Sequence, residues 1–123
     1  MSGARRRAAN AYGLRAETIA GLWLRVHFYR ILARNYRVRG GEIDIVAQRG
    51  ATIVFVEVKA RASIDEALAA LTPQKQRRVA LAANRWVATH PWALQRTLRA
   101  DAILIAPGRW PHWIVSAFEI PRL

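Results

Sequence analysis

The stretch GGEIDIVAQRGATIVFVEVKAR, residues 40–61, combines apolar runs with a concentration of charged residues. Its two apolar runs are separated by a polar, glycine-containing break at residues 48–51, a pattern that predicts a β-hairpin. It also holds three of the chain's eight acidic residues and one of its two lysines. The rest of the chain is therefore expected to be built around this hairpin.

Side chains alternate between the two faces of a strand, which places the charges of the first strand together. Glu42 and Asp44 share one face, while Ile43 and Ile45 take the other. The second strand is apolar on both faces until Glu57, which predicts a central strand covered on both sides. An acidic residue at the end of a buried strand needs a specific role.

Two registers of the hairpin are open. A two-residue loop makes Asp44 face Phe55 and leaves Glu57 on the diagonal, roughly 7 Å away. A four-residue loop puts Asp44 opposite Glu57 and Glu42 opposite Lys59. Both registers gather two carboxylates and an ammonium group at one end of the hairpin, where like charges repel unless a cation or a proton intervenes. The structural alternative is a salt bridge of Lys59 with Glu42 or Glu57.

Carboxylates at this end of the hairpin would suit a hard divalent cation, Mg²⁺ or Mn²⁺. Asp44 and Glu57 supply the oxygen ligands, and the main-chain carbonyl of Val58 could add another. Lys59 would orient an attacking water or stabilise the transition state of phosphodiester hydrolysis. Glu17 could complete the metal shell, directly or through water.

Glu17 belongs to a helix that the apolar periodicity predicts over residues 11–33. It falls on the apolar stripe, where a carboxylate is costly unless it is paired or bound to a metal. The alternative is a solvated glutamate near the start of the helix, favoured by the helix dipole. The preceding residues 1–10 are expected to form a mobile basic tail, and residues 11–123 a single domain.

The formal net charge of +12 is the strongest feature of the composition. It favours a polyanionic partner, with nucleic acid ahead of an anionic membrane surface, and a merely solvated arginine-rich surface is the alternative. The absence of cysteine excludes disulfides and thiolate metal sites. No apolar run approaches a membrane span, so a cytoplasmic protein without membrane contact is expected.

A second helix is expected to begin with Thr72 as N-cap and Pro73 at the first helical position, and to stop before His90. Short strands are predicted at residues 35–39, 99–106 and 113–120, with a loop or single helical turn at residues 60–71. Gly40 and Gly41 let the backbone turn tightly before the hairpin.

The second helix carries candidate supporting residues. Lys75 lies on the first turn of the buried stripe and is expected to point towards the sheet, with Gln74 beside it. Arg77 and Arg78 lie on the flank, where they and Arg61 could contact phosphates or only water.

Asp101 begins an otherwise apolar strand. It either supports the site or has a structural role as the anchor of an arginine, and the structural role is favoured. Residues 109–113 mix cationic and aromatic groups that could stack on bases, although edge-strand packing explains the tryptophans equally well. The last strand and its tryptophans are a candidate homodimer interface.

The hairpin motif GEIDIV followed by VFVEVKAR resembles the YraN-type family of small bacterial proteins of uncharacterised function. Further positions that resemble this family are Gly13, Glu17, Arg34, Asn35, Tyr36, Gln74, Lys75, Arg99 and Asp101. More distantly, the chain is similar to archaeal Holliday junction resolvases and restriction-endonuclease-like nucleases. Their pattern of a helix Glu, an Asp and Glu-x-Lys corresponds by position to Glu17, Asp44, Glu57 and Lys59. Ile43 stands where that superfamily often has proline.

The resemblance implies an α/β, restriction-endonuclease-like fold with a mixed central β-sheet flanked by helices, in the order α-β-β-β-α-β-β. It implies a Mg²⁺- or Mn²⁺-dependent deoxyribonuclease, with branched or damaged DNA among the substrates to consider. The rival is a non-catalytic accessory protein that binds DNA or RNA. Resolvase-like activity would need two sites and hence a homodimer. The geometric prediction is that Glu17, Asp44, Glu57, Lys59 and Lys75 converge on one pocket, with Glu42 next to it or in the turn.

Overall fold

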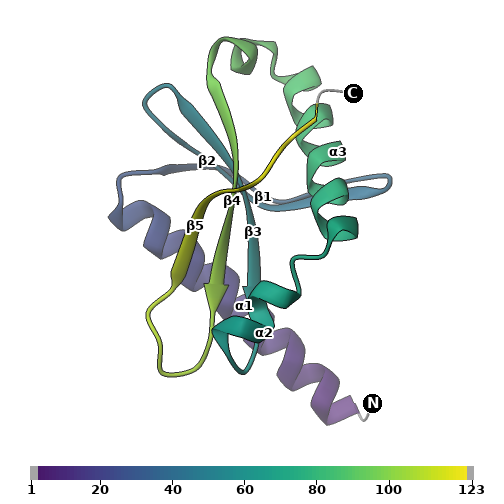
Figure 1. Ribbon diagram of the computed structural model, residues 1–123, viewed down its shortest axis with the longest axis vertical. Helices are drawn as coiled ribbons and strands as arrows, with labels where there is room; N and C mark the ends of the chain where they lie inside the picture. Colours follow the sequence, from purple (N-terminus) through teal and green to yellow (C-terminus); the bar gives the residue numbers. More distant parts are fainter. Residues whose placement is uncertain (1–2, 122–123) are drawn as a thin grey trace.

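The computed structural model describes the backbone of residues 3–121 and the side chains of residues 15–121. Figure 1 shows a central sheet with helices on both sides. The elements, in chain order, are α1 (Gly3–Val26), β1 (Arg30–Val38), β2 (Gly41–Arg49), β3 (Thr52–Ala60), α2 (Ile64–Ala69), α3 (Pro73–Thr89), the 3-10 helix η1 (Pro91–Gln95), β4 (Thr97–Ile105) and β5 (His112–Phe118).

The five strands form one mixed sheet in the order β1-β2-β3-β4-β5. All neighbouring pairs are antiparallel except β3 and β4, which are parallel and connected by α2, α3 and η1. A parallel pair needs such a crossover, because the chain must return to the end where the first strand began. The predicted α/β class, the mixed sheet and its flanking helices are confirmed.

Two hydrophobic cores cover the opposite faces of the sheet. Helix α1 packs on one face through Ala16, Ala20 and Leu24. Helix α3 covers the other face with the predicted stripe, which consists of Val79, Ala82, Ala83, Trp86 and Val87. Strand β3 lies between them, and its residues 53–57 are buried, as predicted for a central strand.

The end of α1 differs from the prediction. The helix stops at Val26, and β1 begins at Arg30 rather than at residue 35. Phe28 adopts the left-handed conformation (φ 70°), its N–H bonds to the carbonyl of Arg25, and the N–H of Tyr29 bonds to that of Leu24. These two bonds form a Schellman motif, in which the left-handed residue is usually glycine. The apolar pattern predicted a helix that runs too far, because an apolar residue, Phe28, stands where a glycine would have marked the end of the helix.

Other boundaries agree more closely. Thr72 caps α3 by accepting a hydrogen bond from the N–H of Lys75, and the helix ends at Thr89. Residues 60–71 contain the short helix α2, one of the two forms expected. Strands β4 and β5 begin and end one or two residues away from the predicted bounds.

Helix α1 extends almost to the start of the chain, and a glycine pair connects β1 to β2. Helix α1 includes residues 3–10, most of the stretch for which a basic tail is expected, while residues 1–2 lie outside the described part. Gly40 turns with φ 80°, and a Cβ on Gly41 would lie 2.6 Å from the carbonyl oxygen of Arg78, so α3 packs directly on the backbone there. Within residues 3–121, no helix combines the length and the apolar character needed to cross a bilayer.

Candidate functional site

Strands β2 and β3 separate at the charged end of the hairpin. Their ladder runs from the pair Arg49–Thr52 to the pair Ile45–Val56 and then ends. Extending this register puts Asp44 in line with Glu57. Of the two alignments that the sequence left open, the structure has the one that aligns the two carboxylates. The four-residue loop expected with it is wrong, because Arg49 pairs with Thr52 and only Gly50 and Ala51 form the turn.

The backbone around Asp44 departs from a regular strand. Ile43 and Ile45 were expected on one face, but Ile45 packs in the α1 core and Ile43 in the α3 core. The N–H of Val58 donates to Oδ2 of Asp44 at 2.8 Å. The carboxylate thus provides the acceptor for this N–H where the β2–β3 ladder has ended, and this bond fixes Asp44 against β3.

Glu57 and Lys59 form a nearly buried ion pair on β3. Lys59 Nζ lies 2.9 Å from Glu57 Oε1, and the side chains are 11% and 4% exposed, respectively. The other oxygen of Glu57, Oε2, is buried without a hydrogen-bond partner, and it is the one such side-chain atom in the described residues. Glu42, the alternative partner of Lys59, instead lies 3.8 Å from Arg37 on β1.

Burial raises the pKa of both central carboxyl groups. The pKa of Glu57 rises to about 7, first because the group is buried and second because of the charge of Asp44, and the ion pair with Lys59 only partly opposes this. Burial also raises the pKa of Asp44, although the hydrogen bond from Val58 and the charge of Lys59 lower it. The charge of Asp44 acts on the pKa of Glu57, so the two carboxyl groups titrate as a pair. The pair is therefore a place where a proton or a cation would relieve repulsion.

Glu17 on α1 lies within electrostatic reach of this pair. Burial and then the charge of Asp44 raise its pKa, while a hydrogen bond with the side chain of Asn35 lowers it. Because α1 begins at Gly3, Glu17 sits in the middle of the helix, and the dipole of the first turn cannot account for it.

Strand β1 adds three polar residues whose role the sequence did not indicate. Asn35 has φ 51° and stands in line with Asp44 in the β1–β2 register. Arg34 and Arg37 also lower the pKa of Glu17, and Arg34 reaches α1, where a Cβ on Gly21 would lie 2.6 Å from its guanidinium. The only sequence signal was the family resemblance at residues 34–36, which covers Arg34 and Asn35 but not Arg37.

The roles of Gln74, Lys75, Arg61, Arg77 and Arg78 at the carboxylate site stay predictions. Lys75 is half-buried and Gln74 exposed on the first turn of α3, and within the described part neither bonds to these carboxylates. Arg61 and Arg77 are exposed, and Arg78 is half-buried.

The donor set at the hairpin is a pair of carboxylates. Among the residues described with side chains, no three His, Cys, Asp or Glu residues lie close enough to form a metal-binding cluster. Asp44 and Glu57 are held together by the strands, whereas Glu17 as a third metal ligand stays a prediction.

Comparison with known sequences assigns the family. The pattern of the uncharacterised protein family UPF0102 matches residues 16–105, which contain every residue of the site. The chain belongs to the UPF0102 family. A UPF0102 protein of Methylocella silvestris is 56% identical over 94% of this chain and 93% of its own length. A UPF0102 protein of Methylorubrum extorquens is 53% identical over 98% of this chain and 94% of its own length. One of Bradyrhizobium diazoefficiens is 50% identical over 91% of this chain and 84% of its own length.

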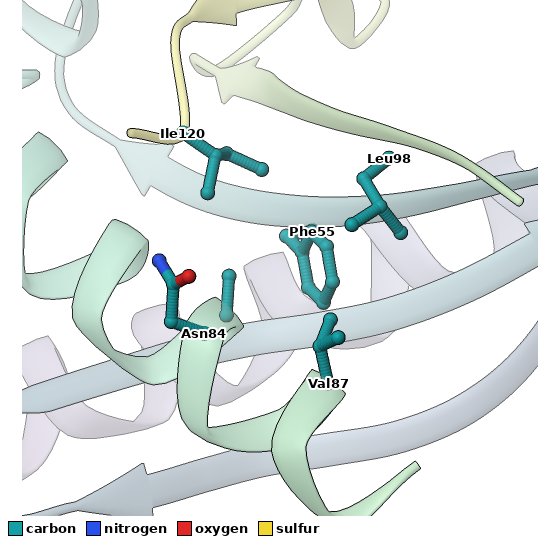
Figure 2. Close-up of a pocket in the computed structure, with 6 residues that line it drawn as sticks. Phe55, Asn84, Val87, Leu98 and Ile120 are labelled. Atoms are coloured by element: carbon teal, nitrogen blue, oxygen red, sulfur yellow. The ribbon is translucent and has the colours of Figure 1, made fainter. Parts of the chain in front are cut away.

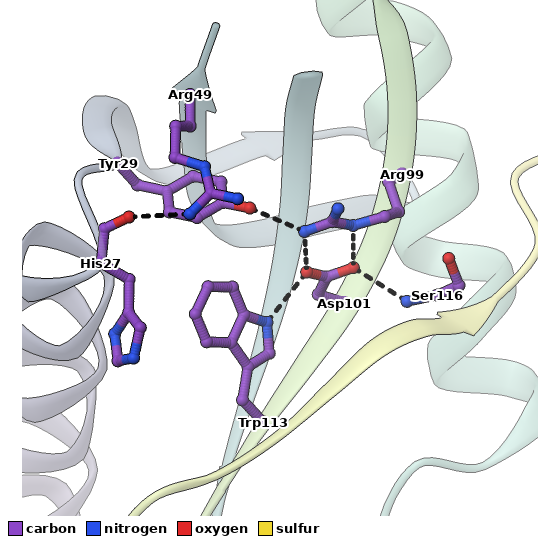
Figure 3. A network of polar contacts seen from close by, with 7 residues as sticks. All are labelled: His27, Tyr29, Arg49, Arg99, Asp101, Trp113 and Ser116. Atoms are coloured by element: carbon purple, nitrogen blue, oxygen red, sulfur yellow. Dashed lines mark hydrogen bonds and ion pairs between the residues drawn. The ribbon is translucent and has the colours of Figure 1, made fainter. Parts of the chain in front are cut away.

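Asp101 in this UPF0102 chain is fully buried and anchors a separate network (Figure 3). Both of its oxygens accept hydrogen bonds from Arg99 at 2.8 Å, and they also accept from Nε1 of Trp113 and the N–H of Ser116. Arg99 in turn donates to the hydroxyl of Tyr29. With this acceptor capacity occupied, Asp101 anchors an arginine, the structural duty that the sequence favoured.

A small pocket of this UPF0102 chain does not include the carboxylates in its lining. It is lined by Phe55, Ala83, Asn84, Val87, Leu98 and Ile120, between α3 and the segment after β5 (Figure 2). The amide of Asn84 donates to the carbonyls of Ala80 and Pro121 and thus ties that segment to α3. The lining carries no titratable group, so it offers no acid–base chemistry.

Proposed function

We propose that this UPF0102 protein is a metal-dependent endonuclease that hydrolyses DNA phosphodiester bonds. The observation that carries the proposal is the buried pair of Asp44 and Glu57 with Lys59 at 2.9 Å, in a chain with a formal net charge of +12. Two carboxylates and a lysine in the arrangement Asp…Glu-x-Lys, with a glutamate on the first helix, also resemble the site of restriction-endonuclease-like nucleases.

The residues of the pair fit a divalent cation. Oε2 of Glu57 is buried without a partner, and one oxygen of Asp44 already bonds to Val58, which leaves hard oxygen donors at one place. Mg²⁺ commonly binds through one or two carboxylates and keeps several waters, so a larger acidic cluster is not required. A bound divalent cation would supply charge neutralisation and an activated water for hydrolysis.

The chain's own residues have distinct tasks in this proposal. Lys59 would donate hydrogen bonds to the phosphate oxygens that gain negative charge as the water attacks. Glu17, with its raised pKa and its bond to Asn35, would accept a proton from that water. Arg34 and Arg37, which lie close enough to Glu17 to lower its pKa, would hold the phosphate backbone next to the carboxylates.

A cleavage assay tests the proposal. End-labelled single-stranded, duplex and four-way-junction DNA, and RNA of the same sequence, are incubated with the protein in Mg²⁺, Mn²⁺ or EDTA. We expect cleavage of DNA only with metal, and a loss of about 100-fold or more in Asp44→Asn and in Lys59→Met. The matched control Glu119→Gln removes an exposed carboxylate and should cleave at the parent rate. Cleavage that persists in both site variants would refute the assignment.

A binding-only protein is the second candidate. Lys59 forms an ion pair with one oxygen of Glu57, and the same contact would be present if the two residues had only a structural role. Tight, salt-sensitive binding of nucleic acid with no cleavage in any metal would favour this candidate.

A further inference from the structure

A series of aromatic rings leads from the interior of the protein to its surface. Tyr29 meets Trp113, and Trp113 meets His27, each with ring centres 5.3 Å apart. His27 meets Trp23 at 5.1 Å, and Trp23 meets Trp110 at 5.7 Å with a tilt of 35°. We call these five side chains the aromatic ladder. Its last member, Trp110, is 81% exposed.

The inner end of the aromatic ladder is fixed by polar contacts (Figure 3). Nε1 of Trp113 donates to Asp101 at 2.9 Å, and the guanidinium of Arg49 lies 4.9 Å above the ring of Tyr29. Arg49 also donates to the carbonyl of His27 at 3.2 Å. The rings beneath Trp110 are thus held in place, so a partner that stacks on Trp110 would not have to order them.

The exposed end of the aromatic ladder lies at the same end of the sheet as the carboxylate site. In the sheet register, Lys59 pairs with Leu104 and Leu104 with His112, so the loop between β4 and β5 begins one strand from Lys59 and ends two strands from it. Two strand spacings correspond to roughly 10 Å. Figure 1 shows this loop at the end of the molecule where β3 stops.

The surroundings of Trp110 are basic. Arg109 next to it is exposed, and so is Arg25 on the last turn of α1. Residues 18–41 and 102–118, which supply all five members of the aromatic ladder and the loop between β4 and β5, contain no acidic residue. An exposed aromatic ring with cationic neighbours matches the chemistry of a nucleic-acid strand, which presents flat bases along an anionic backbone.

We propose that Trp110, supported by Trp23, stacks on an unpaired base of a nucleic acid whose backbone lies along Arg109 towards the carboxylate site. The proposal deepens the proposed function, since it rests on a nucleic-acid substrate but not on cleavage. In duplex DNA the flat faces of the bases are covered by their neighbours, so the stacking surface selects a single-stranded segment, such as a flap or the unpaired part of a junction.

Binding of matched oligonucleotides tests this inference. Fluorescence anisotropy measures the affinity of the metal-free protein for three fluorescein-labelled 20-mers, a single strand, the same strand with abasic sites and a duplex. We expect the intact single strand to bind about 5- to 100-fold more tightly than the abasic strand, which has the same phosphates without the bases. Trp110→Ala should abolish this difference, and Trp110→Phe should keep most of it.

Arg109→Ala is the matched control from the same loop. It should weaken binding to all three oligonucleotides alike and reduce the salt dependence, because it removes a phosphate contact and leaves the ring. A thermal unfolding midpoint of Trp110→Ala close to that of the parent will show that the fold is intact, as expected for an exposed side chain.

Three results would overturn the inference. One is equal binding of intact and abasic strands by the parent. Another is an equal loss of both in Trp110→Ala. A third is a change of oligomeric state in Trp110→Ala, measured by sedimentation equilibrium, with unchanged nucleic-acid affinity, since that would make the surface a contact between copies. Base-dependent binding without cleavage would support stacking on Trp110 and refute nuclease activity. Cleavage without base-dependent binding would support nuclease activity and refute stacking.

Discussion

Replacing Glu57 by glutamine should stabilise the protein at high pH. Glu57 has its pKa raised from 4.5 to about 7 by burial and by the charge of Asp44. Because the folded state holds the proton more tightly than the unfolded state, this group's contribution to stability is complete below about pH 4.5 and is lost as the pH rises through 7. At about 1.4 kcal/mol per pH unit, the loss amounts to about 3 kcal/mol by pH 8.

Glutamine imitates the protonated carboxyl group and does not titrate. In EDTA, the free energy of unfolding of Glu57→Gln should therefore equal that of the parent near pH 4.5 and exceed it by about 3 kcal/mol at pH 8. Urea titrations followed by tryptophan fluorescence would show this as a midpoint higher by about 1–3 M at pH 8. The exposed carboxylate of Glu119 provides the control, and Glu119→Gln should match the parent at each pH.

The same titrations can refute the reasoning. If Glu57→Gln is less stable than the parent at pH 8, the ion pair with Lys59 stabilises the fold and the carboxylate is a structural residue. A difference that is the same at pH 5 and pH 8 would show that the pKa of Glu57 is not raised.

Three further substitutions test the surrounding structure by urea unfolding. Asp44→Ala should lower the free energy of unfolding by about 1–3 kcal/mol, because it leaves the N–H of Val58 unpaired. Asp44→Asn keeps an acceptor and should lower it clearly less. Equal losses would contradict the role of this bond. Asp101→Ala should lower the free energy of unfolding by about 3–5 kcal/mol, because it leaves the partly buried charge of Arg99 without its partner. A loss below 1 kcal/mol would contradict the importance of this network. Gly41→Ala should cost about 1–3 kcal/mol because its Cβ would meet the backbone of α3, and a neutral effect would show that the helix can shift.

The hairpin and α3 could be predicted from the sequence because their signals are local. Apolar runs around a glycine-containing break define β2 and β3, and Thr72 followed by Pro73 marks the start of α3. The end of α1 could not be predicted, because Phe28 takes a left-handed conformation that is usually marked by glycine.

The central residues of the site could also be predicted, since charges on buried strands and helix stripes are conspicuous. The polar residues around them could not. Asn35 meets Glu17 only because β1 pairs with β2 in a register that places it beside Asp44, a long-range contact that no local pattern marks. Asp101 likewise gathers partners from distant segments.

Binding of Mn²⁺ to the carboxylate pair tests the central claim most directly. The decrease of the free-ion signal in electron paramagnetic resonance measures binding to the protein without nucleic acid. We expect one ion per chain, with affinity about tenfold higher at pH 8 than at pH 6, because Glu57 with a pKa of about 7 must lose its proton. Binding should be lost in Asp44→Asn and retained in Glu119→Gln. No bound ion at pH 8, or binding unchanged in Asp44→Asn, would contradict the claim that Asp44 and Glu57 form a metal site.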